Sequence, residues 1–361
     1  MQSTLQPSAV VTLDKTHVNS SPGQEINSPA SFEVPLKTAQ FSVLGAYRFF
    51  LALVVTCGHI STCITPGDWT SFGLWLNQAS ATFGFFVING FAVATSLSHG
   101  DKGFVAWRWG RIYPVYIVNL IMALLVSRLI GGDYTWPQGQ FAPAPTHIEI
   151  LGTICMLVQI ATTYVALDGQ AWCICTDWWM GIIGSYLRRS EVRTIAVIIV
   201  TSLVMYKINS MRLGNGPHLW GDGQAIISVL WIWMSGFLYF RFERKLIGAL
   251  ILIVPPAVAA TAGCFVGWPL LIAALMLIAS SHVKSVPQPF QKIGFWLGDM
   301  AIPLYMCHTW IAAYFCKTLT TSSTAIVFAS LLMSVILVHC VDYPWRRIVA
   351  AKRLSMSRSN K

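Results

Sequence analysis

Apolar segments long enough to cross a lipid bilayer recur along this chain, and they constrain its fold more than any other feature. Hydrophobic residues make up 55% of the 361 residues and charged residues only 11%, whereas ordinary soluble domains carry roughly 25% charged residues. A helix crosses the hydrocarbon core with about 20 residues. We therefore expect an all-α, polytopic membrane protein with about ten transmembrane helices, at residues 44–63, 73–97, 112–130, 173–187, 194–209, 224–240, 246–262, 266–281, 294–316 and 320–341.

The distribution of lysine and arginine sets the expected orientation, because basic residues accumulate in loops that stay in the cytosol. With ten crossings, most of the 24 basic residues fall on one side, together with both termini. An eleventh crossing at residues 149–167 would invert every later loop and remove this bias. We therefore predict that both termini are cytosolic and that residues 149–167 are re-entrant or lie at the outer surface. The net charge of +10 then reflects topology and not a nucleic-acid partner.

The chain divides into three expected regions. Residues 1–40 are polar and lack periodicity, which predicts a disordered cytosolic tail. Residues 41–347 form the transmembrane domain, and residues 348–361 form a basic cytosolic tail. The nine cysteines are scattered, mostly inside apolar segments, so we expect neither a disulfide framework nor a metal site.

Two ionisable side chains interrupt the first apolar segment, Arg48 near its start and His59 eleven residues later. Eleven residues make about three helical turns, so the two side chains share a face and lie about 16 Å apart along the axis. Ionisable groups at membrane depth are costly and usually mark a functional site. Taken singly, Arg48 could instead reach the cytosolic interface and His59 could be a hydrogen-bonded interior residue. Their shared face favours function.

A second basic pair, Arg108 and Arg111, precedes Pro114 near the start of the third predicted span. Arginines at two helix starts on the cytosolic side are suited to hold phosphate groups, although the pair could also only set the topology. An elongated anion entering from the cytosol would rest its phosphates on the arginines and reach His59 with its far end. A phosphopantetheine arm has about that length, and histidine suits general-base chemistry near neutral pH. We therefore expect acyl transfer from acyl-CoA to a hydroxyl delivered from the outer side.

Further motifs follow the Arg48–His59 spacing in chain order. They are GFFVINGF at 84–91, RWGRIYPVY at 108–116, WCICTD at 172–177, LG at 297–298 with LYMCH at 304–308, and DYP at 342–344. As a set covering about residues 40–347, these motifs resemble the transmembrane acyltransferase type 3 family. The sequence departs from the family pattern at Asn89, which replaces a serine, at Asp177, which replaces a glutamate, and at Ala301 and Ile302, which replace a Ser-Tyr pair.

The resemblance implies a multi-pass protein of the bacterial inner membrane that uses acyl-CoA, most often acetyl-CoA, as donor substrate, with no bound cofactor. It implies a lipid-linked or growing polysaccharide or lipopolysaccharide as acceptor at the outer face, with membrane lipid and polysaccharide assembly proteins as further partners. His59 is then the expected base, and Arg48, Arg108 and Arg111 are expected to bind the donor.

Four other side chains are candidates for the same site. Asp177 is a candidate to orient His59 or to bind sugar hydroxyls, and its alternative role is to cap the start of its helix. Asn89, Tyr113 and His308 are candidate substrate contacts. Tyr113 could instead be an interfacial aromatic residue. For His308 the alternatives are a hydrogen-bonded structural histidine and a second catalytic group.

Two other classes of protein compete with an acyltransferase. A secondary transporter could use Arg48 and His59 for substrate binding and proton coupling. Such a protein would be expected to show an internal repeat, and we find no convincing repeat between the two halves of the sequence. The other alternative is a non-catalytic membrane subunit that organises a polysaccharide assembly complex.

Overall fold

The computed structural model describes residues 38–98, 103–213, 224–242, 245–261 and 267–349. All of these residues belong to one unit of mutual contacts, Pro35–Lys361. Helices account for 82% of the described residues, which confirms the predicted all-α class. Most of the two predicted tails lies outside the described residues. Residues 38–40, expected in the tail, are instead helical, because Ala39 and Gln40 are buried and Gln40 Nε2 donates to Ser280 Oγ at 3.4 Å.

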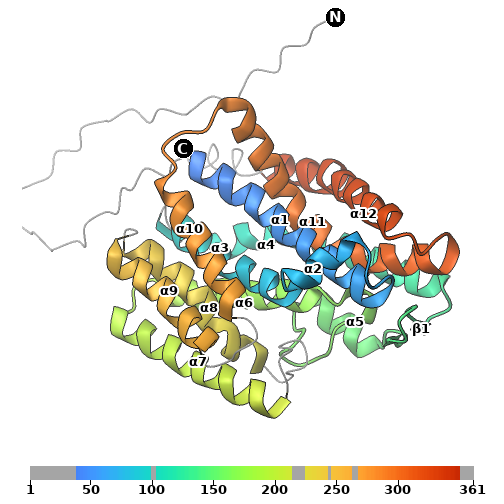
Figure 1. Ribbon diagram of the computed structural model, residues 1–361, viewed down its shortest axis with the longest axis horizontal. Helices are drawn as coiled ribbons and strands as arrows, with labels where there is room; N and C mark the ends of the chain where they lie inside the picture. The colour runs from blue at the N-terminus through green and yellow to red at the C-terminus, as the bar shows by residue number, and fades with distance from the viewer. Residues whose placement is uncertain (1–37, 99–102, 214–223, 243–244, 262–266, 350–361) are drawn as a thin grey trace, which may run out of the picture. The chain divides into compact units, whose positions relative to one another are not determined.

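Each segment predicted to cross the membrane is helical over most of its described residues (Figure 1), but residues 73–97 are divided, because α2 (Phe72–Trp75) ends and α3 (Gln78–Ser98) begins within them. The elements that correspond to the ten predicted spans are α1 Thr38–Cys63, α3 Gln78–Ser98, α4 Phe104–Leu129, α6 Ala171–Leu187, α7 Val192–Leu213, α8 Gln224–Arg241, α9 Leu246–Thr261, α10 Gly267–His282, α11 Gln288–Thr318 and α12 Ser323–Leu337. Five of the described helices are long and apolar enough to cross a bilayer: α1, α3, α4, α7 and the helix that begins with α12.

Short elements connect the long helices. The segment 149–167 is not one helix: α5 (His147–Ile154) ends after eight residues, and only the short η2 (Ala166–Asp168) follows. Eight helical residues span about 12 Å, too little to cross a bilayer. The remaining short elements are η1 Trp69–Ser71, α2 Phe72–Trp75, the antiparallel strands β1 Tyr134–Thr135 and β2 Phe141–Ala142, and the π-turn η4 Val338–Asp342.

Glycines bring two pairs of helices into close backbone contact. A Cβ on Gly45 of α1 would lie 2.3 Å from the carbonyl oxygen of Gly294 in α11. A Cβ on Gly298 of α11 would lie 2.8 Å from the Cα of Gly45. On α3 and α8, Gly90 and Gly236 each face a carbonyl oxygen of the other helix, with a Cβ–oxygen distance of 2.0 Å. Small residues at such crossings allow helices to approach closely without the help of a hydrophobic driving force in lipid. These crossings bring α1 against α11 and α3 against α8.

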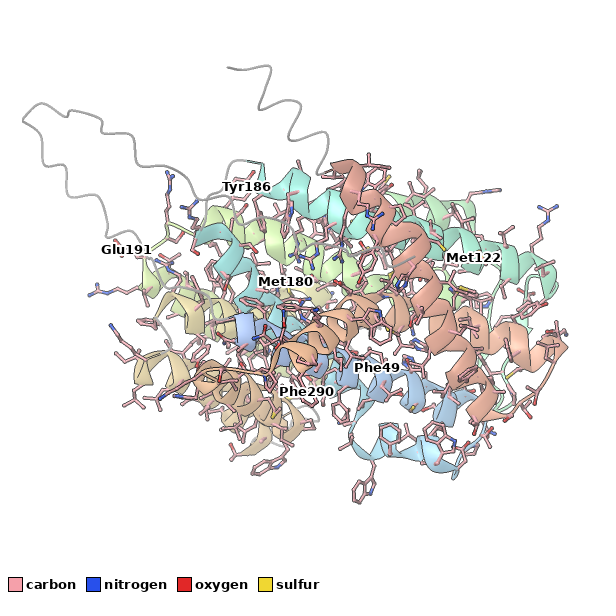
Figure 2. The ribbon with its side chains drawn as sticks, turned by 90° about the horizontal axis from the view of Figure 1, so that it is seen from above. Phe49, Met122, Met180, Tyr186, Glu191 and Phe290 are labelled. Atoms are coloured by element: carbon pink, nitrogen blue, oxygen red, sulfur yellow. The ribbon has the colours of Figure 1, made fainter. Side chains whose placement is uncertain are left out.

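The interior is apolar and aromatic, whereas the rim carries the exposed side chains (Figure 2). On α6, Met180 is fully buried, but Tyr186, less than two turns later, is 81% exposed. The largest fully buried side chains include Trp231 and Trp233 of α8 and Phe86 and Phe91 of α3. The core therefore lies where α1, α3, α6, α8 and α11 meet, and the polar side chains inside it require explanation.

Candidate active site

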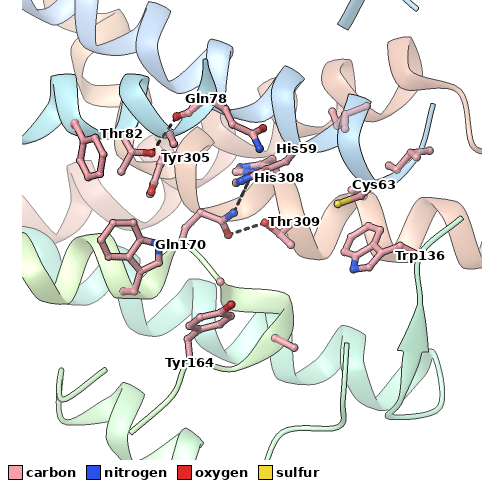
Figure 3. A pocket seen from close by; sticks show the side chains of 18 residues that line it. His59, Cys63, Gln78, Thr82, Trp136, Tyr164, Gln170, Tyr305, His308 and Thr309 are labelled. Carbon is pink, nitrogen blue, oxygen red and sulfur yellow. Dashed lines mark hydrogen bonds between the residues drawn. The ribbon is translucent and has the colours of Figure 1, made fainter. Parts of the chain in front are cut away.

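Two cavities lie along α1, one around Arg48 and one around His59. The first, which we call the arginine chamber, has a volume of about 110 Å³ and is lined by residues that include Arg48, Asn89, Trp107, Arg108, Arg111, Asp177, Asp299, Asp342 and Arg346. The second, the histidine chamber, has about 270 Å³ and is lined by residues that include His59, Cys63, Gln78, Thr82, Trp136, Tyr164, Gln170, Tyr305, His308 and Thr309 (Figure 3).

The order of the lining residues shows that the chambers follow one another along the same helices. Along α1 and α11 the residue numbers rise from the arginine chamber to the histidine chamber, whereas along α3 they fall. Thus α3 runs antiparallel to α1 and α11. Arg48 and His59 are eleven residues apart on α1, which corresponds to about 16 Å.

Two histidines from different helices form the centre of the histidine chamber. His59 Nδ1 lies 2.8 Å from His308 Nε2, and the two rings stack with centroids 5.1 Å apart. His308 is completely buried on α11, and its Nδ1 lies 3.2 Å from the backbone carbonyl oxygen of Leu304. The two rings, which Figure 3 shows side by side, and the carbonyl therefore form one continuous chain of hydrogen bonds.

This chain of hydrogen bonds determines where the protons are. A carbonyl oxygen only accepts, so His308 carries its proton on Nδ1 and donates it to Leu304. In a neutral imidazole the other nitrogen is then an acceptor, so His308 Nε2 accepts the Nδ1 proton of His59. With its proton on Nδ1, neutral His59 has an unprotonated Nε2. The arrangement therefore prepares His59 Nε2 to take up a proton, in the way a carboxylate does for the histidine of a serine-protease triad.

Gln170 and Thr309 hold this pair, and the sequence analysis did not identify them. The amide nitrogen of Gln170 lies 3.1 Å from His59 Nδ1 and 3.2 Å from His308 Nε2. With the protons placed as above, it donates to His308 Nε2, and its approach to the protonated His59 Nδ1 is not a hydrogen bond. The Thr309 hydroxyl donates to Gln170 Oε1 at 2.6 Å, which turns the amide nitrogen toward the histidines. Gln170 stands at the N-cap of α6 but does not cap the helix with its side chain. The only signal in the sequence was its place two residues before the WCICTD motif.

The arginine chamber brings together the three arginines that the sequence predicted to act together. Arg48 Nη2 donates to Asn89 Oδ1 at 2.7 Å. Arg108 forms an ion pair with Asp177 and also donates to the Asp177 carbonyl oxygen at 3.1 Å. The Nε atoms of Arg48 and Arg108 are buried and have no hydrogen-bond partner among the described residues. Unsatisfied buried donors of this kind are suited to an anionic ligand.

A second group of charges lines the arginine chamber, from α11 and from the segment that follows α12. Arg346 forms ion pairs with Asp299 of α11, at 2.9 Å, and with Asp342. The Arg111 guanidinium lies 5.6 Å from the ring centroid of Trp107. Four arginines and three aspartates line the chamber, so it keeps an excess of positive charge. Sequence reasoning assigned no role to Asp299, Asp342 or Arg346, although the LG and DYP motifs adjoin or include the two aspartates.

Asp177 and Tyr113 differ from what the sequence suggested. Asp177 is the seventh residue of α6 and cannot cap it. Its carboxylate accepts from Arg108 and, at 3.1 Å, from Trp233 Nε1, so it lies in the arginine chamber and does not orient His59. Tyr113 lines neither chamber: its hydroxyl donates to the Ile154 carbonyl at 3.0 Å, and its ring stacks on Trp109.

The two other candidate substrate contacts lie in different chambers. Asn89 is the partner of Arg48, and His308 is the partner of His59. Among the described residues, no group of three or more His, Cys, Asp or Glu side chains could hold a metal ion. No family model, no curated protein and no solved structure matches this chain. Assignment to the acyltransferase family therefore rests on its motifs and remains a prediction.

Proposed function

We propose that this chain is an integral membrane O-acyltransferase. It moves an acyl group, expected to be acetyl, from cytosolic acyl-CoA to a hydroxyl of a cell-surface or secreted polysaccharide at the outer face of a bacterial inner membrane. The proposal includes ten crossings and cytosolic termini. In this orientation the arginine chamber opens toward the cytosol and the histidine chamber toward the outer face.

The observation that carries the proposal is the pairing, along α1, of a chamber with excess positive charge and a prepared base. Arg48 and Arg108 each keep a buried, unpartnered Nε, and positive charge exceeds negative charge around them. About 16 Å further along the helix, His59 holds its proton on Nδ1 because His308 accepts it. A nucleotide thioester has the matching polarity, with phosphates at one end and a reactive carbonyl at the other.

The chemistry follows from these positions. His59 Nε2 takes the proton of the acceptor hydroxyl while the oxygen attacks the thioester carbonyl and the carbon–sulfur bond breaks. The resulting imidazolium is stabilised by the lone pair of His308 Nε2 and then returns the proton to the departing CoA thiolate. The products are the O-acylated sugar and CoA with a free thiol. An acyl group first carried by a protein nucleophile would use the same base.

Loss of His59 tests the proposal. The full chain is purified in detergent, and release of CoA thiol from acetyl-CoA is followed with surface glycan that mild alkali has stripped of its O-acyl groups. We expect His59→Ala to abolish glycan-dependent thiol release. His339→Ala is the matched control, because His339 is exposed and hydrogen-bonds only within its own helix, to Val335. Normal glycan acylation by His59→Ala would refute the proposal.

A secondary transporter is the second candidate function, and the separation of the two chambers favours it. Two separate cavities along the same helices would suit a protein that takes up a ligand on one side of the membrane and releases it on the other. The two functions differ in their products. Flux of an acyl-CoA or glycan across sealed vesicles without release of CoA thiol would support transport, whereas thiol release that depends on the glycan supports the transferase.

A further inference from the structure

Two aromatic rings stand between the chambers. Phe85 of α3 lines the arginine chamber, and Tyr305 of α11 lines the histidine chamber. The ring centroids are 5.5 Å apart with an interplanar angle of 57°. Both side chains are buried, with exposed fractions of 6% and 3%. The two chambers therefore adjoin at the contact of these two rings.

The two rings are held differently. Tyr305 is anchored at its hydroxyl, which hydrogen-bonds with the Thr82 and Cys173 side chains. Its ring also packs edge-on against that of His308, with the ring centroids 6.4 Å apart. Phe85 has no polar anchor, and its helix faces α1 at Gly84, where Leu51 fills the space. Rotation of a phenylalanine ring breaks no hydrogen bond. Phe85 is therefore the side of the contact whose ring can turn without loss of a hydrogen bond, whereas the Tyr305 ring is held through its hydroxyl.

Pro303 gives α11 a place to bend next to this contact. It lies inside the helix, two residues before Tyr305, and lines the arginine chamber. Proline has no N–H, so the carbonyl of Asp299 lacks its helical donor. The side chain of Asp299 is meanwhile held by Arg346. The segment that carries Tyr305 is thus connected to the charged end of the arginine chamber.

We propose that the Phe85–Tyr305 contact is the passage through which the acyl thioester reaches His59, and that it selects acyl groups by their cross-section. This inference rests on the proposed acyltransferase function and says which acyl groups of the donor the protein accepts. A straight chain is no wider than the unbranched cysteamine and β-alanine part of the pantetheine arm behind it, and it passes wherever that part of the arm passes. A branched or aromatic acyl group is wider, and the two rings exclude it. Selection at the contact therefore depends on width and not on chain length.

The test compares donors of different width on the full-length protein in detergent. Acetyl-CoA, butyryl-CoA, isobutyryl-CoA and benzoyl-CoA are supplied with the alkali-treated glycan, and kcat/KM is measured from thiol release. We expect Phe85→Ala to raise the ratio for isobutyryl-CoA over butyryl-CoA about tenfold or more, the scale on which pockets discriminate single methylene groups. Phe85→Trp should lower that ratio, because it narrows the passage.

Phe91→Ala is the matched control. Phe91 is a fully buried phenylalanine on the same helix but lines neither chamber, so its loss creates a comparable cavity away from the route. It should leave the donor ratio as in the wild type. If Phe85→Ala does not fold, Phe85→Leu serves in its place, because leucine keeps an apolar contact while removing the ring.

The outcomes separate the two proposals. Thiol release by the wild type with an unchanged donor ratio in the folded Phe85 variants overturns the passage and leaves the acyltransferase standing. A ratio that shifts equally in Phe91→Ala also overturns the passage. Failure of the wild type to consume any acyl-CoA overturns both. A shift confined to the Phe85 variants supports the passage.

Discussion

Replacing His308 with leucine tests the proton arrangement directly. His308 is completely buried, and its Nε2 accepts from His59 Nδ1 at 2.8 Å. Leucine offers no acceptor, so the neutral His59 ring loses a hydrogen bond and the imidazolium that forms during the reaction loses a charge-assisted one, which is roughly twice as strong. The transition state is therefore destabilised by about 1–2 kcal/mol more than the ground state. Since each 1.36 kcal/mol is a factor of ten in rate, we expect kcat to fall roughly 5- to 30-fold.

The assay is release of CoA thiol from acetyl-CoA in the presence of alkali-treated glycan, with thermal unfolding in detergent as the check on folding. His308→Gln supplies an amide oxygen that can accept from His59 and should retain more of the rate than His308→Leu. The KM for acetyl-CoA should stay near the wild-type value, because His308 lies in the chamber away from the arginines. A folded His308→Leu variant within twofold of the wild-type kcat would refute the reasoning.

Three further predictions concern the arginine chamber, a helix cap and a helix crossing. Arg108→Gln leaves Asp177 as a buried, unpaired charge and should lower the free energy of unfolding by about 3–5 kcal/mol. The double variant with Asp177→Asn should recover the melting temperature, but titration calorimetry should show that it does not recover binding of acetyl-CoA. Burial tends to raise the pKa of Glu149, but hydrogen bonds from the Thr146 N–H and hydroxyl, together with one from a second threonine hydroxyl, outweigh it and hold that pKa below 4.5. The stabilising carboxylate is therefore present above about pH 4.5 and is lost as the pH falls through the lowered pKa, so the difference in melting temperature between wild type and Glu149→Gln should shrink from about pH 6 to about pH 3. Gly45→Ala should lower the melting temperature more than an alanine at an open helical glycine such as Gly110, because its Cβ would lie 2.3 Å from a carbonyl oxygen of α11.

The helices could be predicted from the sequence because apolar length alone specifies them in a membrane. The grouping of Arg48, Arg108 and Arg111 was predictable as well, since all three occur near the starts of predicted spans on the same expected side. Their neighbours were not. Asp177 was expected beside His59 because a helix start was placed at residue 173. In the structure its carboxylate lies in the second turn of α6 and pairs with Arg108 in the arginine chamber.

The shared face of Arg48 and His59 was predictable, but the separation of their chambers was not. That separation depends on Phe85 and Tyr305, which come from α3 and α11 and meet only through tertiary packing. Gln170 was equally inaccessible, because its side chain acts from a turn before α6 on a histidine more than 100 residues away. Periodicity places residues on faces of helices, but it does not say which faces of distant helices meet.

The glycine crossing of α1 and α11 has a consequence for how this protein could change shape. Backbone contact at Gly45, Gly294 and Gly298 leaves no side-chain layer over which the two helices could slide. The distance between the guanidinium of Arg48 and the imidazole of His59 on α1 is therefore constant. The contact between the two chambers can open only if the part of α11 beyond Pro303 bends away, or if α3 moves.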